Sequence, residues 1–230
     1  MSIDIIIPTL NEYSQLEVLL PYLKHHLPNN QSSIIVVDAQ KSSDKTQELC
    51  RQHDIFYLKS KFNQRAAQLN EGVKKSKAKV ILLLHADVTP PTTFASDISD
   101  LLSSDVDFGL FAYRLDSPKF MLKINSYFTQ FDMLMAGGGD QCHFMTKSSF
   151  IQLGGYDESY DIMEDFEFFD RIKKSPLKYA IVQSKAKVSA RKYDKNSWLR
   201  VNLVNLFVFM RYKFGAPPNT LKLFCDRWLG

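Results

Sequence analysis

The chain has 230 residues, of which 45% are hydrophobic and 23% are charged, and its formal net charge is +4. A chain of this length suits one α/β domain, and it can bury roughly 70% of its surface without a disulfide or a structural metal. Its lysines and arginines do not gather with aromatic residues in one basic stripe, so we expect no nucleic-acid partner.

Cysteine usage and the N-terminal residues bear on the cellular location. Cys50, Cys142 and Cys225 are widely separated and lack zinc-ligand spacing, which favours reduced thiols. The first residues lack the basic start and the cleavage site of a signal peptide. We therefore expect a soluble, cytoplasmic protein.

The first half alternates short apolar runs with amphipathic segments. The predicted strands are Ile3–Ile7, Ile34–Val37, Ile55–Leu58 and Val80–Leu84. The predicted helices between them cover Leu16–Leu23, Thr46–His53 and Asn63–Lys75. This alternation predicts right-handed crossovers and a parallel sheet.

The second half has mixed character. It contains predicted helices at Phe94–Leu102, Phe120–Met135, Ser148–Leu153 and Glu164–Lys174, and predicted strands at Phe108–Leu115 and Cys142–Met145. We predict one domain over residues 1–230, with halves of about 1–90 and 91–230.

Polar side chains follow three of the predicted strands. Pro8-Thr-Leu-Asn-Glu12 follows the first, Asp38 follows the second, and His85-Ala-Asp87 follows the fourth. In an open parallel sheet, ligands bind outside the carboxyl ends of the strands. Helix capping is an alternative for each side chain alone, but three such strand ends together favour a binding site.

Asp87 is the candidate metal ligand of this group. Mg²⁺ or Mn²⁺ typically takes one or two carboxylates together with the phosphates of a substrate. His85 lies two residues away, and a histidine bonded to the backbone is the alternative for it. The chain has no Gly-x-Gly-x-x-Gly after the first strand and no Gly-x-x-x-x-Gly-Lys, which disfavours a dinucleotide site and a P-loop.

Asp165 heads an apolar stripe on the predicted helix 164–174. On a helix, Asp165, Phe168, Phe169 and Ile172 share one face. The acids here could simply complement the positive end of the helix. An inward carboxylate at the lip of a pocket is also a candidate general base.

Segment 198–214 is crowded with apolar side chains and contains Arg200, Arg211 and Lys213. Its longest uncharged run, Val201–Met210, is only half of what a bilayer span needs. Packing in the core is one interpretation. Peripheral contact with a membrane surface is the alternative.

The order of these motifs resembles the GT-A glycosyltransferases of family 2, most closely the bacterial subfamily described as radical-SAM/selenodomain-associated glycosyltransferases. The resemblance runs from about Ile3 to Gly215. The matching segments are Ile6-Ile-Pro-Thr-Leu-Asn-Glu12, Val36-Val-Asp-Ala-Gln-Lys-Ser-Ser-Asp-Lys-Thr46, Gln64-Arg65 through Asn70-Glu-Gly72, Leu84-His-Ala-Asp87, Gly139-Asp-Gln141, Gly154-Gly-Tyr156 and Met163-Glu-Asp165. Two departures are Ala39-Gln40 in place of Gly-Gly, and His85 in place of the first Asp of the metal motif.

The resemblance implies a GT-A fold, with a mixed, mostly parallel central sheet flanked by helices. It also implies inverting transfer of a sugar from a nucleoside-diphosphate sugar to an acceptor hydroxyl. Under it, Pro8, Thr9, Glu12, Asp38, Arg65 and His85 bind the nucleotide, Asp87 binds Mn²⁺ or Mg²⁺, Asp165 is the catalytic base, and Asp140, Gln141 and Glu164 lie on the acceptor side. The acceptor is open, and a lipid-linked acceptor would accompany membrane contact through 198–214.

Two other function classes stay open. A sugar-phosphate nucleotidyltransferase uses a related sheet, although no Gly-rich loop with Lys or Arg follows the first strand. A non-catalytic nucleotide-sugar-binding protein of the same fold would need no base at Asp165. The fold alone does not separate these classes.

Overall fold

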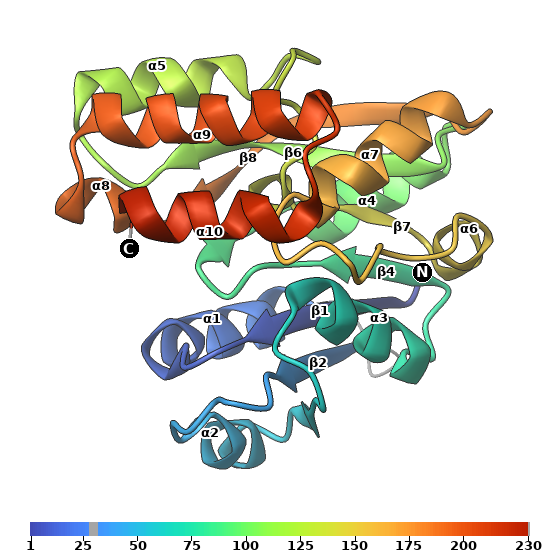
Figure 1. Ribbon diagram of the computed structural model, residues 1–230. Coiled ribbons are helices and arrows are strands. Elements are labelled where there is room, and N and C mark those ends of the chain that lie inside the picture. Colours follow the sequence, from blue (N-terminus) through green and yellow to red (C-terminus); the bar gives the residue numbers. More distant parts are fainter. Residues whose placement is uncertain (28–31, 230) are drawn as a thin grey trace.

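One eight-stranded sheet forms the centre of the protein (Figure 1). The structure is a computed structural model that describes residues 1–27 and 32–229. The strand order is β3-β2-β1-β4-β7-β6-β8-β5. Strands β3, β2, β1 and β4 run parallel, as do β6 and β8, whereas β7 and β5 pair antiparallel with their neighbours. Helices flank this mixed, mostly parallel sheet, which confirms the predicted α/β class.

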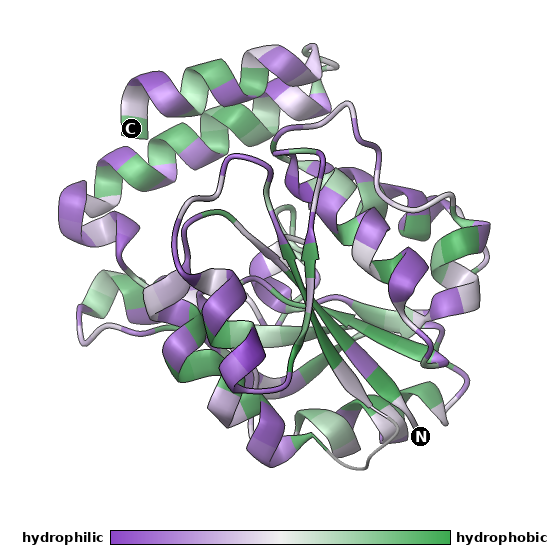
Figure 2. Ribbon diagram, turned by 90° about the horizontal axis from the view of Figure 1, so that it is seen from below, coloured by the Kyte–Doolittle hydropathy of each residue, from purple (hydrophilic) through white to green (hydrophobic). Residues whose placement is uncertain are grey.

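The first half supplies the parallel strands. These are β1 (Ile3–Thr9), β2 (Ser33–Asp38), β3 (Phe56–Lys59) and β4 (Val80–Leu83), linked by α1 (Tyr13–His26), α2 (Thr46–Gln52) and α3 (Arg65–Lys75). Every residue of β1 is buried because helices cover both faces of the sheet. Figure 2 accordingly shows hydrophobic strands at the centre and helices of alternating hydropathy around them.

The helix α3 packs very closely against the sheet. A Cβ atom at Gly72 would lie 2.4 Å from Cγ2 of Ile6 and 2.9 Å from Cγ2 of Val37. Only glycine allows this approach. It also brings Gln68 of α3 to the carboxyl ends of β1 and β2.

The second half completes the sheet and covers it. Its strands are β5 (Val88–Thr89), β6 (Phe108–Leu115), β7 (Phe144–Thr146) and β8 (Tyr179–Val188). Its helices are α4 (Phe94–Leu102), α5 (Phe120–Phe128), the 3-10 helix η1 (Gly139–Gln141), α6 (Lys147–Gln152), α7 (Glu164–Lys174), α8 (Lys192–Lys195), α9 (Trp198–Lys213) and α10 (Pro218–Leu229). Helices α9 and α10 lie side by side over this half (Figure 1).

The structure corrects the prediction of one helix over Phe120–Met135. The helix α5 ends at Phe128, and the chain then turns. The Thr129 hydroxyl donates to Tyr113 O at 2.8 Å, and Tyr113 N donates to Thr129 Oγ1 at 2.9 Å. These bonds tie the end of α5 to β6, and they depend on a contact that helical periodicity does not encode.

The long strand β8 and the helix α10 were not predicted. Half-exposed residues, with lysines among them, make up much of β8, so it lacks the apolar run of the other strands. Parallel pairing with β6, interrupted by a bulge between Phe111 and Ala112, holds it in the sheet. In the described part of the chain, no helix has the length and apolar character that crossing a membrane requires.

Candidate active site

Thr9 and Asp38 end the neighbouring strands β1 and β2 and face each other in the parallel register. The Thr9 hydroxyl donates to Asp38 Oδ1 at 3.0 Å. The Tyr57 hydroxyl and the Lys59 ammonium each donate to Asp38 Oδ2 at 3.0 Å. Burial and the neighbouring Asp38 carboxylate raise the pKa of Tyr57. Three protein donors therefore hold the charge of the buried Asp38 carboxylate.

Gln68 and a second contact of Lys59 also organise these strand ends. The Gln68 amide on α3 donates to Thr9 O at 2.9 Å and to Val37 O at 2.7 Å. Lys59 also donates to Ser42 O at 2.8 Å, and its side chain is 41% exposed. Lys59 is thus the partner of Asp38 that can most easily move toward solvent.

His85, Asp87 and Asp140 come together at the carboxyl end of β4. Each offers one ligand atom, and these atoms lie within 4.8 Å of one another. His85 Nδ1 is 3.5 Å from Asp140 Oδ1. The structure therefore places Asp140, which sequence reasoning assigned to the acceptor side, next to the predicted metal ligand.

The surroundings of Asp140 keep its carboxyl group ionised. Burial alone would favour the neutral form. The hydrogen bond with His85 and the charges of Lys192, His85 and Arg65 outweigh burial and hold the pKa of Asp140 well below its usual range. An ionised carboxylate is the form that binds a metal ion.

Gln141 braces the turn that carries Asp140. Its side-chain oxygen accepts a hydrogen bond from Gly137 N at 2.7 Å, and its amide donates to Thr129 O at 3.1 Å. Since both ends of this buried amide bind backbone, Gln141 supports the shape of the η1 loop.

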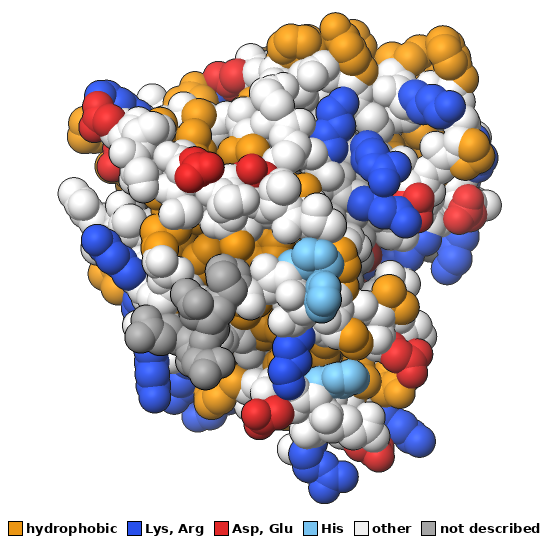
Figure 3. Space-filling view, turned by 180° about the vertical axis from the view of Figure 1, so that it is seen from behind, with side chains coloured by type: hydrophobic (Ala, Val, Ile, Leu, Met, Phe, Trp, Pro, Cys, Tyr) orange, Lys and Arg blue, Asp and Glu red, His pale blue; other side chains and the backbone are white. Residues whose placement is uncertain are grey.

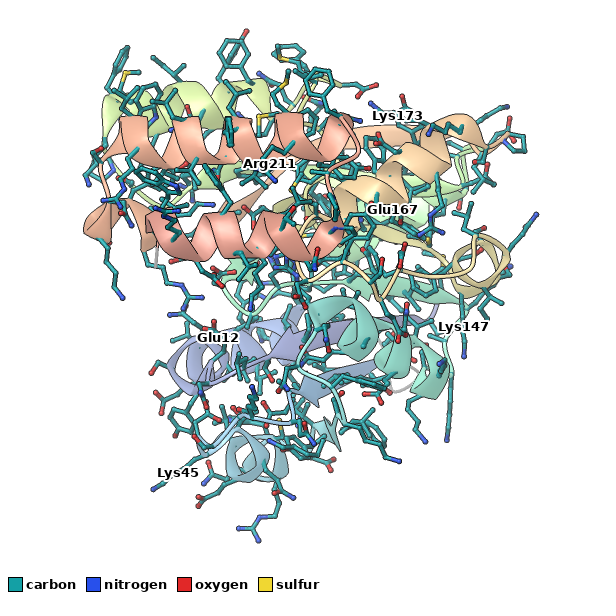
Figure 4. All side chains as sticks on the ribbon, in the orientation of Figure 1. Glu12, Lys45, Lys147, Glu167, Lys173 and Arg211 are labelled. Atoms are coloured by element: carbon teal, nitrogen blue, oxygen red, sulfur yellow. The ribbon has the colours of Figure 1, made fainter. Side chains whose placement is uncertain are left out.

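Arg191, which follows β8, joins the two halves at this site. Its guanidinium donates to the two carboxylate oxygens of Glu12 at 2.8 and 2.6 Å, and it lies 3.4 Å from Asp87 Oδ2. Glu12 immediately precedes α1, and Figure 4 shows it between α1 and α10. Arg191 therefore links Glu12 to the metal-ligand group.

Asp165 lies in the first turn of α7, as predicted, and is buried. Gly139 N donates to Asp165 Oδ2 at 2.5 Å and Phe166 N to Oδ1 at 2.8 Å. Phe168, Phe169 and Ile172 are buried below it, which confirms the inward stripe. Two backbone donors thus fix the orientation of this carboxylate.

Arg65 stands at the centre of an acidic group. Its Nε donates to Glu164 Oε1, and Glu164 is 1% exposed. Burial would lower the pKa of Arg65, but the nearby carboxylates of Glu164, Asp165 and Asp140 raise it above the ordinary value. Among the described residues, the other Glu164 oxygen, Oε2, has no protein partner although it is buried.

His85 and Asp165 both lie against Gly139. A Cβ atom at this position would lie 2.4 Å from His85 Nε2 and 3.2 Å from Asp165 Oδ2. The imidazole of the metal-ligand group and the candidate base therefore both approach the Cβ position of one glycine, and a larger residue there would displace them.

His143 supports the same glycine loop from within the core. Its Nε2 lies 2.9 Å from Gly137 O and its Nδ1 lies 3.1 Å from the Tyr156 hydroxyl. These contacts assign the proton to Nε2, so that the ring donates to Gly137 O and accepts from Tyr156. Burial lowers the pKa of His143 to about 4, and the ring is neutral at pH 7.

The sequence model of the family described as "Glycosyl transferase family 2" matches residues 4–149. The chain belongs to glycosyl transferase family 2. The match includes Asp38, the His85, Asp87 and Asp140 group, and the η1 loop, but it stops before Asp165. A search of curated protein sequences finds no match.

Solved structures share the fold of this family 2 chain. The mannosyltransferase PcManGT from Pyrobaculum calidifontis, in complex with GDP-Man and Mn²⁺, has a TM-score of 0.70 at 15% identity, over 92% of this chain and 63% of that one. TarS 1-349 from S. aureus has a TM-score of 0.68 at 14% identity, over 90% and 64%. Its complex with UDP-GlcNAc scores 0.68 at 15% identity, over 83% and 59%.

These likenesses confirm the predicted GT-A fold. The chain spans only 59 to 64% of the length of these three solved chains.

The structure divides the residues predicted for nucleotide binding in this family 2 chain. Thr9 and Asp38 form one network, and the buried Pro8 continues β1 beside them. Glu12 pairs with Arg191, and Arg65 pairs with Glu164. Lys59 and Tyr57 were missed, although Lys59 ends the third strand and the rule applied to the other strand ends would have found it.

Proposed function

We propose that this chain transfers a sugar from a nucleoside-diphosphate sugar to an acceptor hydroxyl, with inversion at the anomeric carbon. The observation that carries the proposal is that His85, of the His85, Asp87 and Asp140 group, and Asp165 both lie against Gly139. A donor diphosphate and an acceptor hydroxyl would meet between these groups. One GT-A unit over residues 1–230 would perform the reaction in the cytoplasm.

The Asp38 network is the proposed nucleoside side of the donor site. Thr9 and Pro8 shape the strand end, and Lys59 is free to turn from Asp38 toward a phosphate or a base. TarS binds UDP-GlcNAc and PcManGT binds GDP-Man, which supports a nucleotide-sugar donor for this chain as well.

The residues at β4 and η1 fit a divalent metal ion. One imidazole and two carboxylates with mutually close ligand atoms form the donor set, and Asp140 is held ionised. Carboxylates suit Mg²⁺ and Mn²⁺, and the imidazole favours Mn²⁺ of the two. Such an ion supplies Lewis-acid stabilisation of the diphosphate leaving group. His85 also fits the proposed membership of the radical-SAM/selenodomain-associated subfamily, in which His often stands in place of the first Asp of the metal motif.

Asp165 is the proposed general base. Its two backbone hydrogen bonds leave half of the lone pairs of an ionised carboxylate free to accept the proton of a hydroxyl. Glu164 and Arg65 lie next to it, and their buried ion pair would support the acceptor side of the site. Gln141 would act indirectly, by holding the η1 loop.

Binding of UDP, GDP, dTDP and CDP, measured by titration calorimetry with and without Mn²⁺, tests the donor site. One of these nucleotides should bind more tightly with the ion, and Asp87→Ala should remove that gain while weak nucleotide binding persists. Asp116→Ala, which removes an exposed carboxylate that pairs with Lys187, is the matched control. Metal-dependent binding that survives in Asp87→Ala would exclude Asp87 from the site.

The two alternative classes are separated by product analysis. A nucleotidyltransferase would release pyrophosphate from a nucleoside triphosphate, whereas a glycosyltransferase releases a nucleoside diphosphate. A non-catalytic binding protein would bind the donor without turnover. The acceptor would be lipid-linked if segment 198–214 contacts a membrane.

A further inference from the structure

Large apolar side chains are exposed along α5, loop 129–136 and α9, which together we call the apolar face. Phe120 is 73% exposed, Leu134 is 66% exposed and Phe214 is 82% exposed. Figure 4 shows aromatic rings and sulfur-bearing side chains projecting from α5 and α9 away from the rest of the molecule, and Figure 3 shows hydrophobic side chains along this upper edge. Soluble monomers rarely expose so many apolar side chains together.

The helix α9 is apolar on two opposite sides. Val201, Val204 and Val208 recur at helical spacing and are buried against the protein. Leu199, Leu203, Leu206 and Met210 recur at the same spacing and are exposed. One stripe therefore packs against the domain, and the second remains largely exposed.

The helices α5 and α9 form one continuous surface. The Asn125 amide donates to Asn202 Oδ1 at 2.9 Å, and the Trp198 indole donates to Asn125 Oδ1 at 3.4 Å. Beside Trp198, a hollow of about 180 Å³ opens against the first turn of α5. The exposed side chains of both helices can thus contact one and the same partner surface. The hollow can receive an apolar group of that partner.

The charges on the apolar face are positive. Neither α5 nor α9 contains Asp or Glu. Lys123 and Arg200 are exposed, and within the described part of the chain they form no ion pair. Asp132, the only acid in loop 129–136, is paired with Lys173. Positive side chains around an exposed apolar stripe are the pattern of a peripheral helix at an anionic membrane.

We propose that the apolar face docks on an anionic lipid bilayer. A symmetric dimer through this face would oppose one set of positive charges to another, so a second copy of the chain fits it less well. Loop 129–136 runs directly into Gly137–Gly139, and Gly139 N binds the proposed base Asp165. Docking would therefore bring the acceptor side close to the bilayer and select a lipid-linked acceptor, a conclusion that rests on the proposed function.

Cosedimentation of the full chain with phosphatidylcholine vesicles, with and without phosphatidylserine, tests the docking. The protein should bind the anionic vesicles at low salt and lose most of this binding at high salt. The triple variant Leu134→Ser, Leu203→Ser and Phe214→Ser should bind at least about tenfold more weakly, a change of about 1.4 kcal/mol. A matched triple variant at exposed apolar residues elsewhere, Val18→Ser, Phe56→Ser and Ile151→Ser, should bind like the wild type.

The pair Lys123→Gln and Arg200→Gln provides a second test that leaves the apolar stripe intact. It should reduce the preference for phosphatidylserine and leave nucleotide binding unchanged. Absence of wild-type binding to anionic vesicles at low salt, or equal losses in the two triple variants, would overturn the docking. So would self-association of the wild type that the first triple variant abolishes. Nucleotide binding is measured in a separate titration. If the wild type binds anionic vesicles but no nucleotide, this result contradicts the proposed function and leaves the docking supported.

Discussion

His143 should make the stability of this protein depend on pH in a predictable direction. Burial lowers the pKa of this histidine to about 4, from an ordinary 6.5. In the unfolded chain the ring takes up a proton as the pH falls through about 6.5, while in the folded protein it stays neutral down to about 4. The unfolded state therefore binds more protons in this window, and the free energy of unfolding falls as the pH falls.

The size of this effect follows from the shift. Each pKa unit corresponds to about 1.36 kcal/mol, so between pH 7 and pH 4.5 His143 alone should remove about 2 to 3 kcal/mol of stability. That is a large part of the roughly 5 to 15 kcal/mol that stabilises a typical domain.

Urea denaturation at pH 7 and at pH 4.5, followed by circular dichroism, measures this difference. His143→Gln cannot take up the proton, so it should lose about 2 to 3 kcal/mol less than the wild type between the two pH values, whatever its cost at pH 7. Tyr156→Phe removes the hydroxyl that faces Nδ1 but keeps the imidazole, and it should retain the pH dependence. The reasoning fails if His143→Gln loses as much stability on acidification as the wild type does.

Two further predictions concern the acidic group. Asp165→Asn should lower turnover by about 10²–10⁴-fold without weakening nucleotide binding. The control Asp161→Asn, four residues earlier, should change neither turnover nor nucleotide binding. Full activity of Asp165→Asn would show that Asp165 is not the base. Arg65→Met should cost about 3 kcal/mol in urea denaturation because it leaves the buried Glu164 carboxylate unpaired. Adding Glu164→Gln should recover part of that loss, and additive costs of the two changes would show that the pair is not coupled.

Local sequence patterns determined much of the fold. The apolar, largely β-branched runs predicted β1, β2 and β4, because strands covered on both faces favour apolar residues. The spacing of Asp165 and the apolar residues of α7 predicted a buried carboxylate, which the structure confirms. The boundaries of α4, β6 and α7 agree with the prediction residue for residue.

Contacts between distant segments decided the rest, since no local period records them. Asp140 joined His85 and Asp87 only because β7 pairs antiparallel with β4 and brings η1 to the end of that strand. Arg65 at the start of α3 pairs with Glu164 at the start of α7, a contact between segments 99 residues apart that no local pattern predicts. The strand β8 is half-exposed and owes its place to pairing with β6. An apolar sequence such as α9 shows how much hydrophobic surface exists, and only the tertiary structure shows which stripe is buried and which is left for a partner.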